Sequence, residues 1–325
     1  MSGASDIVVL GSLHLDVLVQ APGLPRLGET MSGSAVAFRP GGKGGNQAVA
    51  AARHGARHGA RVAMIGAIGD DASGVTLRAH LRAHGVDDAQ VATHPGAASG
   101  MSVAISEPGG DYAAVIVSGA NLRLGALPPD AVAALLGARV LVLQNEVPEA
   151  ANLAAARVAH ACGCRVILNA APARTLPKEL AALLDILVVN ALEAEALCGV
   201  PVTDAASAQA AATALSRQMR CAIVTAGGNG VALAAGGTEI KSAAGGLGSM
   251  HIPAHAVRVL STHGAGDAFV GALAARRAAG DALDAAGRYA NAAAALLVST
   301  PHPAGEQLGA DAVSRMLAGA PAPGP

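Results

Sequence analysis

The sequence predicts an α/β protein: a three-layer sandwich with a central, mostly parallel sheet and a small β-sheet lid. Short apolar segments bounded by glycine alternate with alanine-rich helical segments along most of the 325 residues. The apolar segments are nearly continuous, which is typical of parallel strands covered by helices on both faces. Hydrophobic residues make up 52% of the chain and charged residues 14%, which excludes global disorder.

Each predicted strand is a short run of aliphatic residues, and each predicted helix is an alanine-rich stretch that lies between strands or follows a glycine-rich turn. The predicted strands are residues 7–10, 62–65, 140–143, 166–168, 186–189, 222–225 and 231–234. The predicted helices are residues 46–54, 73–84, 148–161, 192–197, 205–217, 265–279 and 282–298.

Two regions interrupt this alternation, at about residues 13–40 and 98–118. They contain extended segments with polar interruptions and turn signals such as Pro22-Gly23. We expect a small antiparallel sheet attached to one edge of the main sheet, which could serve as a lid. A pair of ordinary surface hairpins fits the pattern equally well. Residues 1–325 are expected to form a single domain into which these segments are inserted, with a frayed tail at 318–325.

The composition excludes several classes of partner. Lys and Arg number 22 against 23 Asp and Glu, so the net charge is −1, and the chain has no basic block. We therefore expect no nucleic-acid or membrane-surface partner. Two Phe, two Tyr and no Trp leave almost no stacking platform for bases. No apolar run approaches the roughly 18 residues that a membrane span needs.

The cysteines and the N-terminus favour a cytoplasmic location. The N-terminal residues lack the basic start and long apolar run of a signal peptide. Cys162, Cys164, Cys198 and Cys221 are few for this length, and no second pair stands at zinc-type spacing, so we expect buried free thiols. An Arg-His-Gly-Ala duplication at residues 53–60 is expected to lengthen a surface connection and not to bind metal.

The first motif with chemical potential is Gly41-Gly42-Lys43-Gly44-Gly45-Asn46-Gln47, directly before an alanine-rich helix. Glycines allow backbone N–H groups to approach a ligand closely, and a helix N-terminus favours polar or anionic groups. The motif is not a phosphate-binding P-loop, because the required spacing and the Ser or Thr after the lysine are absent. Taken alone, a glycine-rich turn explains it equally well.

The second motif is Thr262-His263-Gly264-Ala265-Gly266-Asp267, which opens another alanine-rich helix. Backbone N–H groups at this helix start would form an anion hole, and Asp267 is suited to take a proton from an alcohol. A helix-capping aspartate is the plainer interpretation of Asp267. Two glycine-rich helix starts and a carboxylate in one α/β chain favour phosphoryl transfer.

These two motifs, in this order and separation, resemble the signatures of the ribokinase-like (PfkB-type) carbohydrate kinases over nearly the whole chain. The resemblance implies an ATP-dependent sugar kinase with the family's single domain and lid. The resemblance favours D-ribose as the acceptor and D-ribose 5-phosphate as the product. It also implies that Asp267 is the general base, with Gly264, Ala265 and Gly266 as the anion hole.

Further site residues follow from the resemblance. Those implied to bind the sugar are Asp16, Gly42, Lys43, Asn46, Glu146 and Asp267. Those implied to bind the nucleotide are Asn190, Thr225, Gly227, Gly230, Gly266 and Asn291. Asn190 and Glu193 match a motif that organises Mg²⁺ through water, and their spacing places both on one face if a helix follows the strand. A homodimer formed through the lid is also implied.

The chain departs from the family around an activating monovalent cation. Ser261 stands where an Asp is usual, and the turn that starts at Ser299 has an unusual sequence. Activation by K⁺ is therefore left open.

The sequence leaves three other functions to consider beside a ribose kinase. Another pentose or hexose kinase, or a nucleoside kinase, would use the same site, although few aromatic side chains are available to stack on a base. A binding protein that has lost catalysis is compatible with the fold but not favoured by the retained Asp267. A dinucleotide-dependent dehydrogenase is disfavoured, because the Gly-x-Gly-x-x-Gly pattern is absent.

Overall fold

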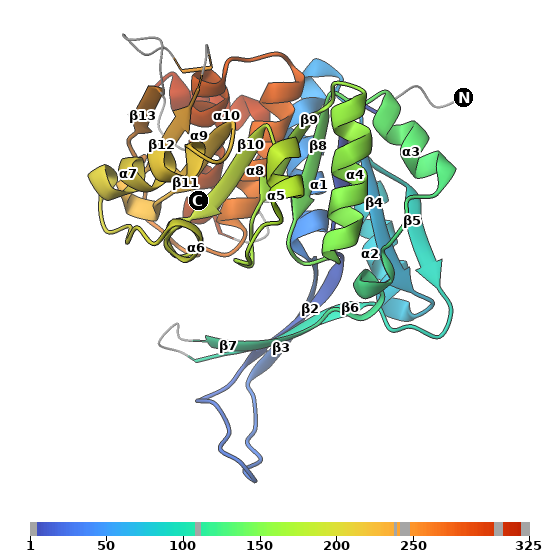
Figure 1. The fold of residues 1–325 in the computed structure, drawn as a ribbon. Coiled ribbons are helices and arrows are strands. Elements are labelled where there is room, and N and C mark those ends of the chain that lie inside the picture. Colours follow the sequence, from blue (N-terminus) through green and yellow to red (C-terminus); the bar gives the residue numbers. More distant parts are fainter. Residues whose placement is uncertain (1–4, 108–111, 237–238, 241–247, 302–307, 320–325) are drawn as a thin grey trace.

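The computed structural model describes residues 5–107, 112–236, 239–240, 248–301 and 308–319. Within them, nine strands form one main sheet in the order β13-β12-β11-β10-β9-β8-β1-β4-β5 (Figure 1). Only β12 runs against the others, so the expected mostly parallel sheet is confirmed. In sheet order the strands are β13 (Gly248–Ile252), β12 (Val231–Ala235), β11 (Cys221–Thr225), β10 (Ile186–Asn190), β9 (Arg165–Asn169), β8 (Val140–Gln144), β1 (Ile7–Leu10), β4 (Val62–Gly69) and β5 (Val86–His94).

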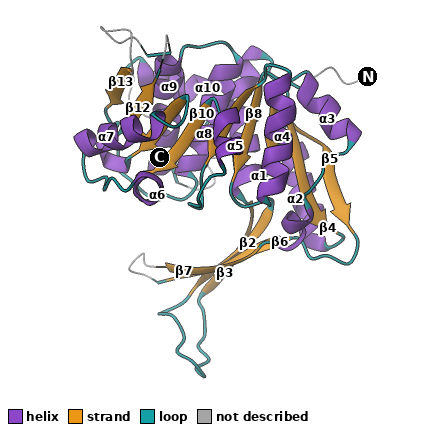
Figure 2. Cartoon of the chain, viewed as in Figure 1, coloured by secondary structure: helices purple, strands orange, loops and turns teal. Residues whose placement is uncertain are grey.

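Helices cover both faces of the main sheet and complete the three-layer sandwich (Figure 2). Along β1, Ile7 and Val9 face one hydrophobic core while Val8 and Leu10 face the other, as strand geometry requires. The helices of the first face are α1 (Lys43–Gly55), α2 (Ala72–Ala83), α8 (Ala265–Ala278), α9 (Leu283–Ser299) and α10 (Ala310–Leu317). The helices of the second face are α3 (Pro129–Leu136), α4 (Glu149–Ala161), α5 (Lys178–Leu183), α6 (Ala191–Cys198) and α7 (Ala205–Ser216). Short 3-10 turns η1 (Ala56–His58), η2 (Gly119–Arg123) and η3 (Gly227–Asn229) lie between them.

A second sheet, called the small sheet here, contains β3 (Ala35–Gly41), β2 (His14–Gln20), β6 (Gly100–Ser106) and β7 (Tyr112–Val117) in that order. It projects away from the main body, on the side where the parallel strands of the main sheet end (Figure 1). The expectation of a small sheet is confirmed, but the expectation that it is antiparallel is wrong at its centre, where β2 and β6 are parallel. The reason is that β2 follows β1 and β6 follows β5. Both parent strands are parallel to β4 and therefore leave the main sheet in the same direction.

All predicted strands and helices are present within a few residues of their expected bounds. The strands β5 and β13 were not predicted. Both lie at edges of the main sheet, where exposed polar residues interrupt the apolar run. The helices α3, α5 and α10, each of eight residues or fewer, were also missed.

The smaller sequence predictions are partly confirmed. The four cysteines are free, but only Cys164 and Cys221 are buried as expected. Cys162 is exposed at the end of α4, and Cys198 is half-buried. The duplication forms a surface connection, because α1 ends at Gly55 and residues 56–59 are exposed. Of the predicted frayed tail, residues 320–325 lie outside the described part of the chain. Among the described residues, no helix is long and apolar enough to cross a membrane.

A buried histidine links α1 to α9 on the first face. His54 is 3% exposed, and its Nδ1 lies 3.2 Å from the Tyr289 hydroxyl. The Arg276 guanidinium stacks over the Tyr289 ring at 5.0 Å from its centroid. Burial, with a smaller contribution from the charge of Arg53, lowers the pKa of His54 to about 4.

This histidine makes stability depend on pH. Unfolded His54 binds a proton below about pH 6.5, whereas folded His54 does so only below about 4. The unfolded state therefore gains protons first, and the free energy of unfolding should fall by at most about 3 kcal/mol as the pH drops through this window. Urea unfolding of the wild type and of His54→Leu between pH 7 and 4 measures this. The variant should lose the part of the slope that His54 contributes, and identical slopes would show that His54 does not titrate as argued.

Candidate active site

The glycine-rich starts of α1 and α8 lie side by side because the two helices pack closely. A Cβ on Gly271 of α8 would stand 2.5 Å from the Ala50 Cβ and 2.7 Å from the Gln47 carbonyl oxygen of α1. Only glycine permits this approach. Gly42, before α1, has φ of 83°, and a Cβ there would also meet the backbone of His14 and Ser12 at under 3 Å. These glycines fix where the side chains of the two helix starts meet.

Asp267 lies at that meeting point, in the first turn of α8. Its carboxylate accepts hydrogen bonds from Asn46 Nδ2 at 3.0 Å and from Gln47 Nε2 at 2.9 Å. The side chain is 8% exposed, and burial raises its pKa above the usual range for aspartate. The positive charge of Lys43 and the two amide donors act in the opposite direction. Asp267 is therefore a buried, hydrogen-bonded carboxylate that still borders a cavity.

Sequence reasoning assigned no role to Gln47, although the motif contains it. Gln47 is fully buried, and its amide nitrogen also donates to Asn169 Oδ1 at 3.0 Å. Its amide oxygen accepts from Gln144 Nε2 at 2.9 Å. Gln144 and Asn169 each end a buried strand, β8 and β9, at the edge where parallel strands present ligand sites. In the sequence, a polar residue at the end of each of these apolar strands was the feature that could have indicated this hydrogen-bond network.

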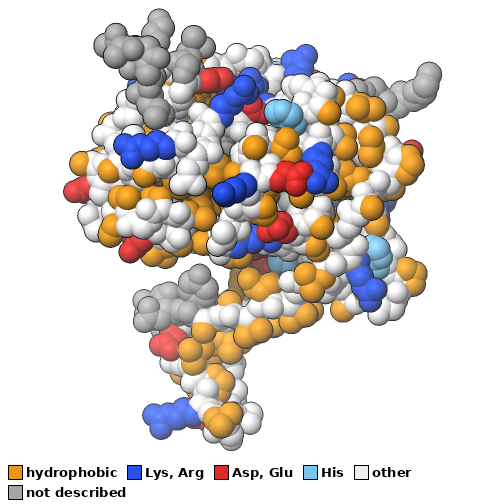
Figure 3. All heavy atoms as spheres, in the orientation of Figure 1, with side chains coloured by type: hydrophobic (Ala, Val, Ile, Leu, Met, Phe, Trp, Pro, Cys, Tyr) orange, Lys and Arg blue, Asp and Glu red, His pale blue; other side chains and the backbone are white. Residues whose placement is uncertain are grey.

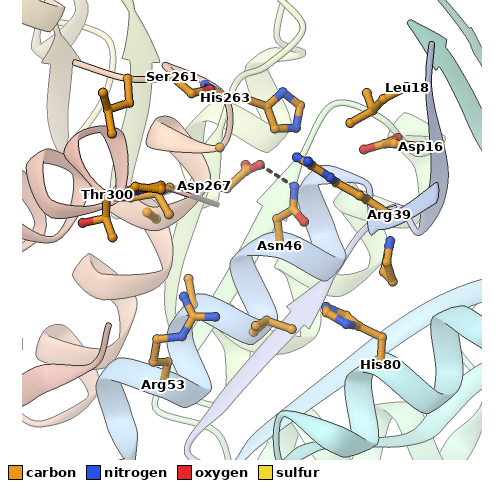
Figure 4. Close-up of a pocket in the computed structure, with 18 residues that line it drawn as sticks. Asp16, Leu18, Arg39, Asn46, Arg53, His80, Ser261, His263, Asp267 and Thr300 are labelled. Atoms are coloured by element: carbon orange, nitrogen blue, oxygen red, sulfur yellow. Dashed lines mark hydrogen bonds between the residues drawn. The ribbon is translucent and has the colours of Figure 1, made fainter. Parts of the chain in front are cut away.

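A cavity of about 450 Å³ borders Asp267 (Figure 4). One face of α1 forms its floor, and the start of α8 and the segment around residues 260–264 form one wall. The small sheet forms another wall with Asp16, Leu18 and Arg39. Of the residues implied to bind the sugar, Asp16, Asn46 and Asp267 line this cavity, together with Gly264 of the implied anion hole.

Hydrogen bonds of the residues implied to bind the sugar connect the segments around the cavity. Glu146 Oε2 accepts from Ser12 Oγ at 2.5 Å and from the Lys43 backbone N–H at 3.0 Å, which ties the start of α1 to the β8–α4 connection. Asp16 accepts from Ser102 Oγ at 2.5 Å, which ties β2 to β6. The charge of Lys43 lowers the pKa of Asp267, and the charge of Glu146 raises it.

Two of the residues implied to bind the nucleotide, Asn190 and Thr225, end β10 and β11. Asn190 pairs with Thr225 in the strand register, and Asn190 caps α6 in a reciprocal capping box with Glu193. The helix after the strand and the shared face are therefore as expected. Burial raises the pKa of Glu193, the Lys43 charge lowers it, and the Asp267 charge raises it, so Glu193 lies near the catalytic candidates.

The two glycines of the next turn differ in their surroundings. Gly227 has φ of 55° and no neighbour within 4 Å of a Cβ, whereas Gly230 has φ of 81° and is tight against the Ile252 carbonyl. Gly227 therefore leaves room for a ligand, and Gly230 serves the turn itself. Asn291, implied to lie near the adenine, is 8% exposed and donates to the Pro253 carbonyl at 2.9 Å, which holds the segment after β13 against α9.

Comparison with known proteins decides the family. The model of the pfkB family of carbohydrate kinases matches residues 4–306. The chain belongs to this family.

The chain is 34% identical over 295 residues to the ribokinase of Haemophilus influenzae, with 90% of this chain and 92% of that one covered. It is 32% identical over 272 residues to the deoxyribokinase of Salmonella typhi, with 83% and 84% covered. The solved structure of Arabidopsis thaliana ribokinase complexed with ribose and ATP matches with a TM-score of 0.84 and 28% identity, and covers 97% of this chain and 99% of that one. The expected membership of the ribokinase-like carbohydrate kinases is thus confirmed.

In the region expected to concern a monovalent cation, the described residues Ser261 and Ser299 present hydroxyl groups. The Ser261 hydroxyl accepts from the His263 N–H at 3.2 Å, and the backbone N–H of Ser261 donates to Val298. The Ser299 hydroxyl donates to carbonyls of its own helix, Ala295 and Leu296. Residues 302–304 of the unusual turn lie outside the described part of the chain.

The described residues fit a Mg²⁺ ion that is held chiefly by nucleotide phosphates and water. They contain no cluster of three or more His, Cys, Asp or Glu side chains that could form a cage of its own. One half-buried carboxylate, that of Glu193 in the first turn of α6, is the kind of donor expected for a magnesium ion that keeps most of its water ligands.

Proposed function

We propose that this kinase is a ribokinase, which transfers the γ-phosphoryl group of ATP to the primary hydroxyl of D-ribose and forms D-ribose 5-phosphate and ADP. The observation that carries this proposal is the buried Asp267, held by Asn46 and Gln47 at a helix N-terminus that opens onto the cavity. The similarity to ribokinases over nine-tenths of the chain supports it.

In the proposed reaction, Asp267 accepts the proton of the sugar hydroxyl as its oxygen forms a bond to the γ-phosphorus. The bond between that phosphorus and the β–γ bridging oxygen breaks, and ADP leaves with its electron pair. The backbone N–H groups of Gly264, Ala265 and Gly266 at the start of α8 are proposed to stabilise the charge that collects on the phosphoryl oxygens. Without a ligand the Ala265 N–H donates to the Thr262 carbonyl at 3.3 Å. Asn190 and Glu193 would hold Mg²⁺ through water beside ATP, and the ion would neutralise phosphate charge.

Asp16, Asn46, Glu146 and Lys43, with the backbone of Gly42, are proposed to hold the sugar. Carboxylate oxygens and an amide suit a ligand with adjacent hydroxyls, because each accepts or donates to two neighbours. The small sheet carries Asp16 on the side that faces the cavity, so closure of this sheet over the sugar would exclude water from the reaction. Residues 1–325 are proposed to act as one domain, with the small sheet as its lid.

Thr225, Gly227 and Gly230 are proposed to form the nucleotide loop, beside Asn190. The pairing of Asn190 with Thr225 supports this, as does the free space around Gly227. Asn291 is proposed to border the adenine from α9, where its amide already supports the segment after β13. The free cysteines fit an enzyme of the reducing cytoplasm.

The proposal is tested by ADP release from Mg·ATP with a panel of pentoses, hexoses and nucleosides, in K⁺ and in Na⁺. Strong stimulation by D-ribose supports the ribokinase assignment. A preference for 2-deoxy-D-ribose would instead assign the activity named for the Salmonella typhi relative. Stimulation by no acceptor in a folded preparation would contradict a kinase function. The ratio of rates in K⁺ and Na⁺ measures the consequence of Ser261.

Replacement of the two aspartates should separate chemistry from binding. We expect Asp267→Asn to lower kcat by roughly 10²- to 10⁴-fold with little change in sugar affinity. The amide cannot accept the proton, and it accepts only one of the two hydrogen bonds from Asn46 and Gln47. Asp16→Asn should weaken sugar binding roughly 10- to 100-fold. Steady-state kinetics and calorimetric titration of the sugar measure both. An Asp267→Asn enzyme with normal turnover would refute the base assignment.

The Gln47 hydrogen bond should set the pKa of the proposed base, Asp267. Its amide donates to the ionised carboxylate of Asp267 and so lowers the pKa of that group. In Gln47→Leu the pKa should rise, and the acidic limb of kcat/KM should move to higher pH, because the base must be ionised to act. Asn169→Ala is the matched control, since it removes the other partner of the Gln47 amide and leaves the bond to Asp267 in place. A limb that stays in place, or moves to lower pH, in Gln47→Leu contradicts this role.

We propose that two copies pair through the outer face of the small sheet. Val17, Phe38, Val103 and Val115 form one row across its strands, and Phe38 and Val115 are 63% and 68% exposed. Figure 3 shows hydrophobic side chains gathered along this sheet. Exposed apolar patches of this kind mark interaction surfaces.

The pairing is tested by sedimentation of single-site variants. Wild-type protein should have the mass of a dimer, and Val115→Lys should be monomeric because a charge enters the apolar face. Val75→Lys is the matched control, since Val75 is similarly exposed, at 72%, but lies on α2. A wild-type monomer, or a dimer that survives Val115→Lys, would count against this interface.

A further inference from the structure

Arg39 is a cation on the inner face of the small sheet. It lies on β3 directly opposite Asp16 of β2 in the antiparallel register, so the two side chains share a face. That face borders the cavity, which Arg39 lines together with Asp16 and Asp267. In Figure 4 the Arg39 side chain extends across the cavity above Asn46, toward Asp267 and His263. The neighbouring Phe38 points to the outer, apolar face and is exposed.

The guanidinium of Arg39 has no hydrogen-bond or ion-pair partner among the side chains and carbonyls of the described residues, although Asp16 and Asp267 line the same cavity. Arg78, by contrast, is an arginine whose guanidinium is satisfied within the protein. It donates to the Asp88 carboxylate and to the carbonyls of Asp88 and Val91. The donors of the half-buried Arg39 guanidinium face the cavity and are available to acceptors that a ligand supplies. Its five donors and permanent charge suit an anionic oxygen far better than a neutral sugar hydroxyl.

We infer that Arg39 binds the phosphoryl group in transfer and the phosphate of the product. This inference rests on the proposed kinase function and adds a catalytic residue to it. The phosphoryl group must arrive beside Asp267 and the start of α8, which is the end of the cavity toward which Arg39 extends. The sugar hydroxyls already have Asp16 and Asn46 as partners, whereas the phosphoryl oxygens gain their cation from the small sheet.

The location of Arg39 gives this contact a second consequence. Because β3 belongs to the small sheet, the cation reaches the phosphoryl group only when that sheet lies over the acceptor. The strand pair β2–β3 therefore binds the sugar through Asp16 and stabilises the transferred phosphoryl group through Arg39. The phosphoryl group therefore has the positive charge of Arg39 beside it only in the closed complex. This favours transfer to the sugar over transfer to water.

The test compares affinities for D-ribose 5-phosphate and D-ribose by calorimetric titration, together with kcat and KM. Arg39→Gln should weaken binding of the phosphorylated sugar roughly 10- to 100-fold and lower kcat, with the affinity for D-ribose changed by less than about threefold. Arg39→Lys keeps the charge and should retain part of both properties. Arg26→Gln, at an exposed arginine in the β2–β3 connection of the same sheet, should match the wild type.

The outcomes separate the alternatives. An unchanged ratio of the two affinities in Arg39→Gln overturns the inference. Equal loss of both affinities, with a lowered thermal midpoint, would assign Arg39 to the sugar or to the sheet itself and also overturns it. If the wild type phosphorylates an acceptor other than D-ribose, the ribokinase assignment fails separately, and the same ratio is measured with that acceptor and its phosphate.

Discussion

The close packing of α8 against α1 is the constraint on which the site depends. Gly271 has no side chain, and its backbone therefore rests against Ala50 and the Gln47 carbonyl. This contact sets the distance between the helix starts, and with it the two hydrogen bonds that orient Asp267. A larger residue at 271 would push the helices apart and lengthen both bonds together. The chemistry at one end of α8 thus depends on a glycine one turn further along the same helix.

The small sheet has two faces with opposite chemistry, and the strand register explains how one short segment serves both. Successive residues of a strand point to opposite sides, so Asp16 and Arg39 face the cavity while Val17 and Phe38 face outward. The parallel pairing of β2 with β6 follows from the direction in which β1 and β5 leave the main sheet. A dimer on the outer face would stiffen the strands that position the polar residues on the inner face.

The sequence allowed most of the fold to be predicted, because strands buried on both faces are continuous aliphatic runs whose pattern depends little on their neighbours. It failed for β5 and β13, whose edge positions permit polar residues that erase this pattern. The glycine-rich helix starts and Asp267 were recognisable as motifs. Gln47 and Arg39 were not assigned roles, since their significance comes from contacts between segments far apart in the chain: Gln47 with Asp267, Asn169 and Gln144, and Arg39 with the cavity.

The electrostatics around Asp267 balance two needs of a proton-accepting carboxylate. Burial, with the Glu146 charge, raises its pKa and so increases its affinity for the proton of an alcohol. Unopposed, the same burial would leave the group protonated and unable to act. The Lys43 charge and the Asn46 and Gln47 donors favour the ionised form. Since Lys43 and Asn46 are also proposed to hold the sugar, arrival of the acceptor changes the surroundings of the base that will deprotonate it. Substrate binding and activation of the base are therefore expected to be coupled through the first turn of α1, the element that contributes to both.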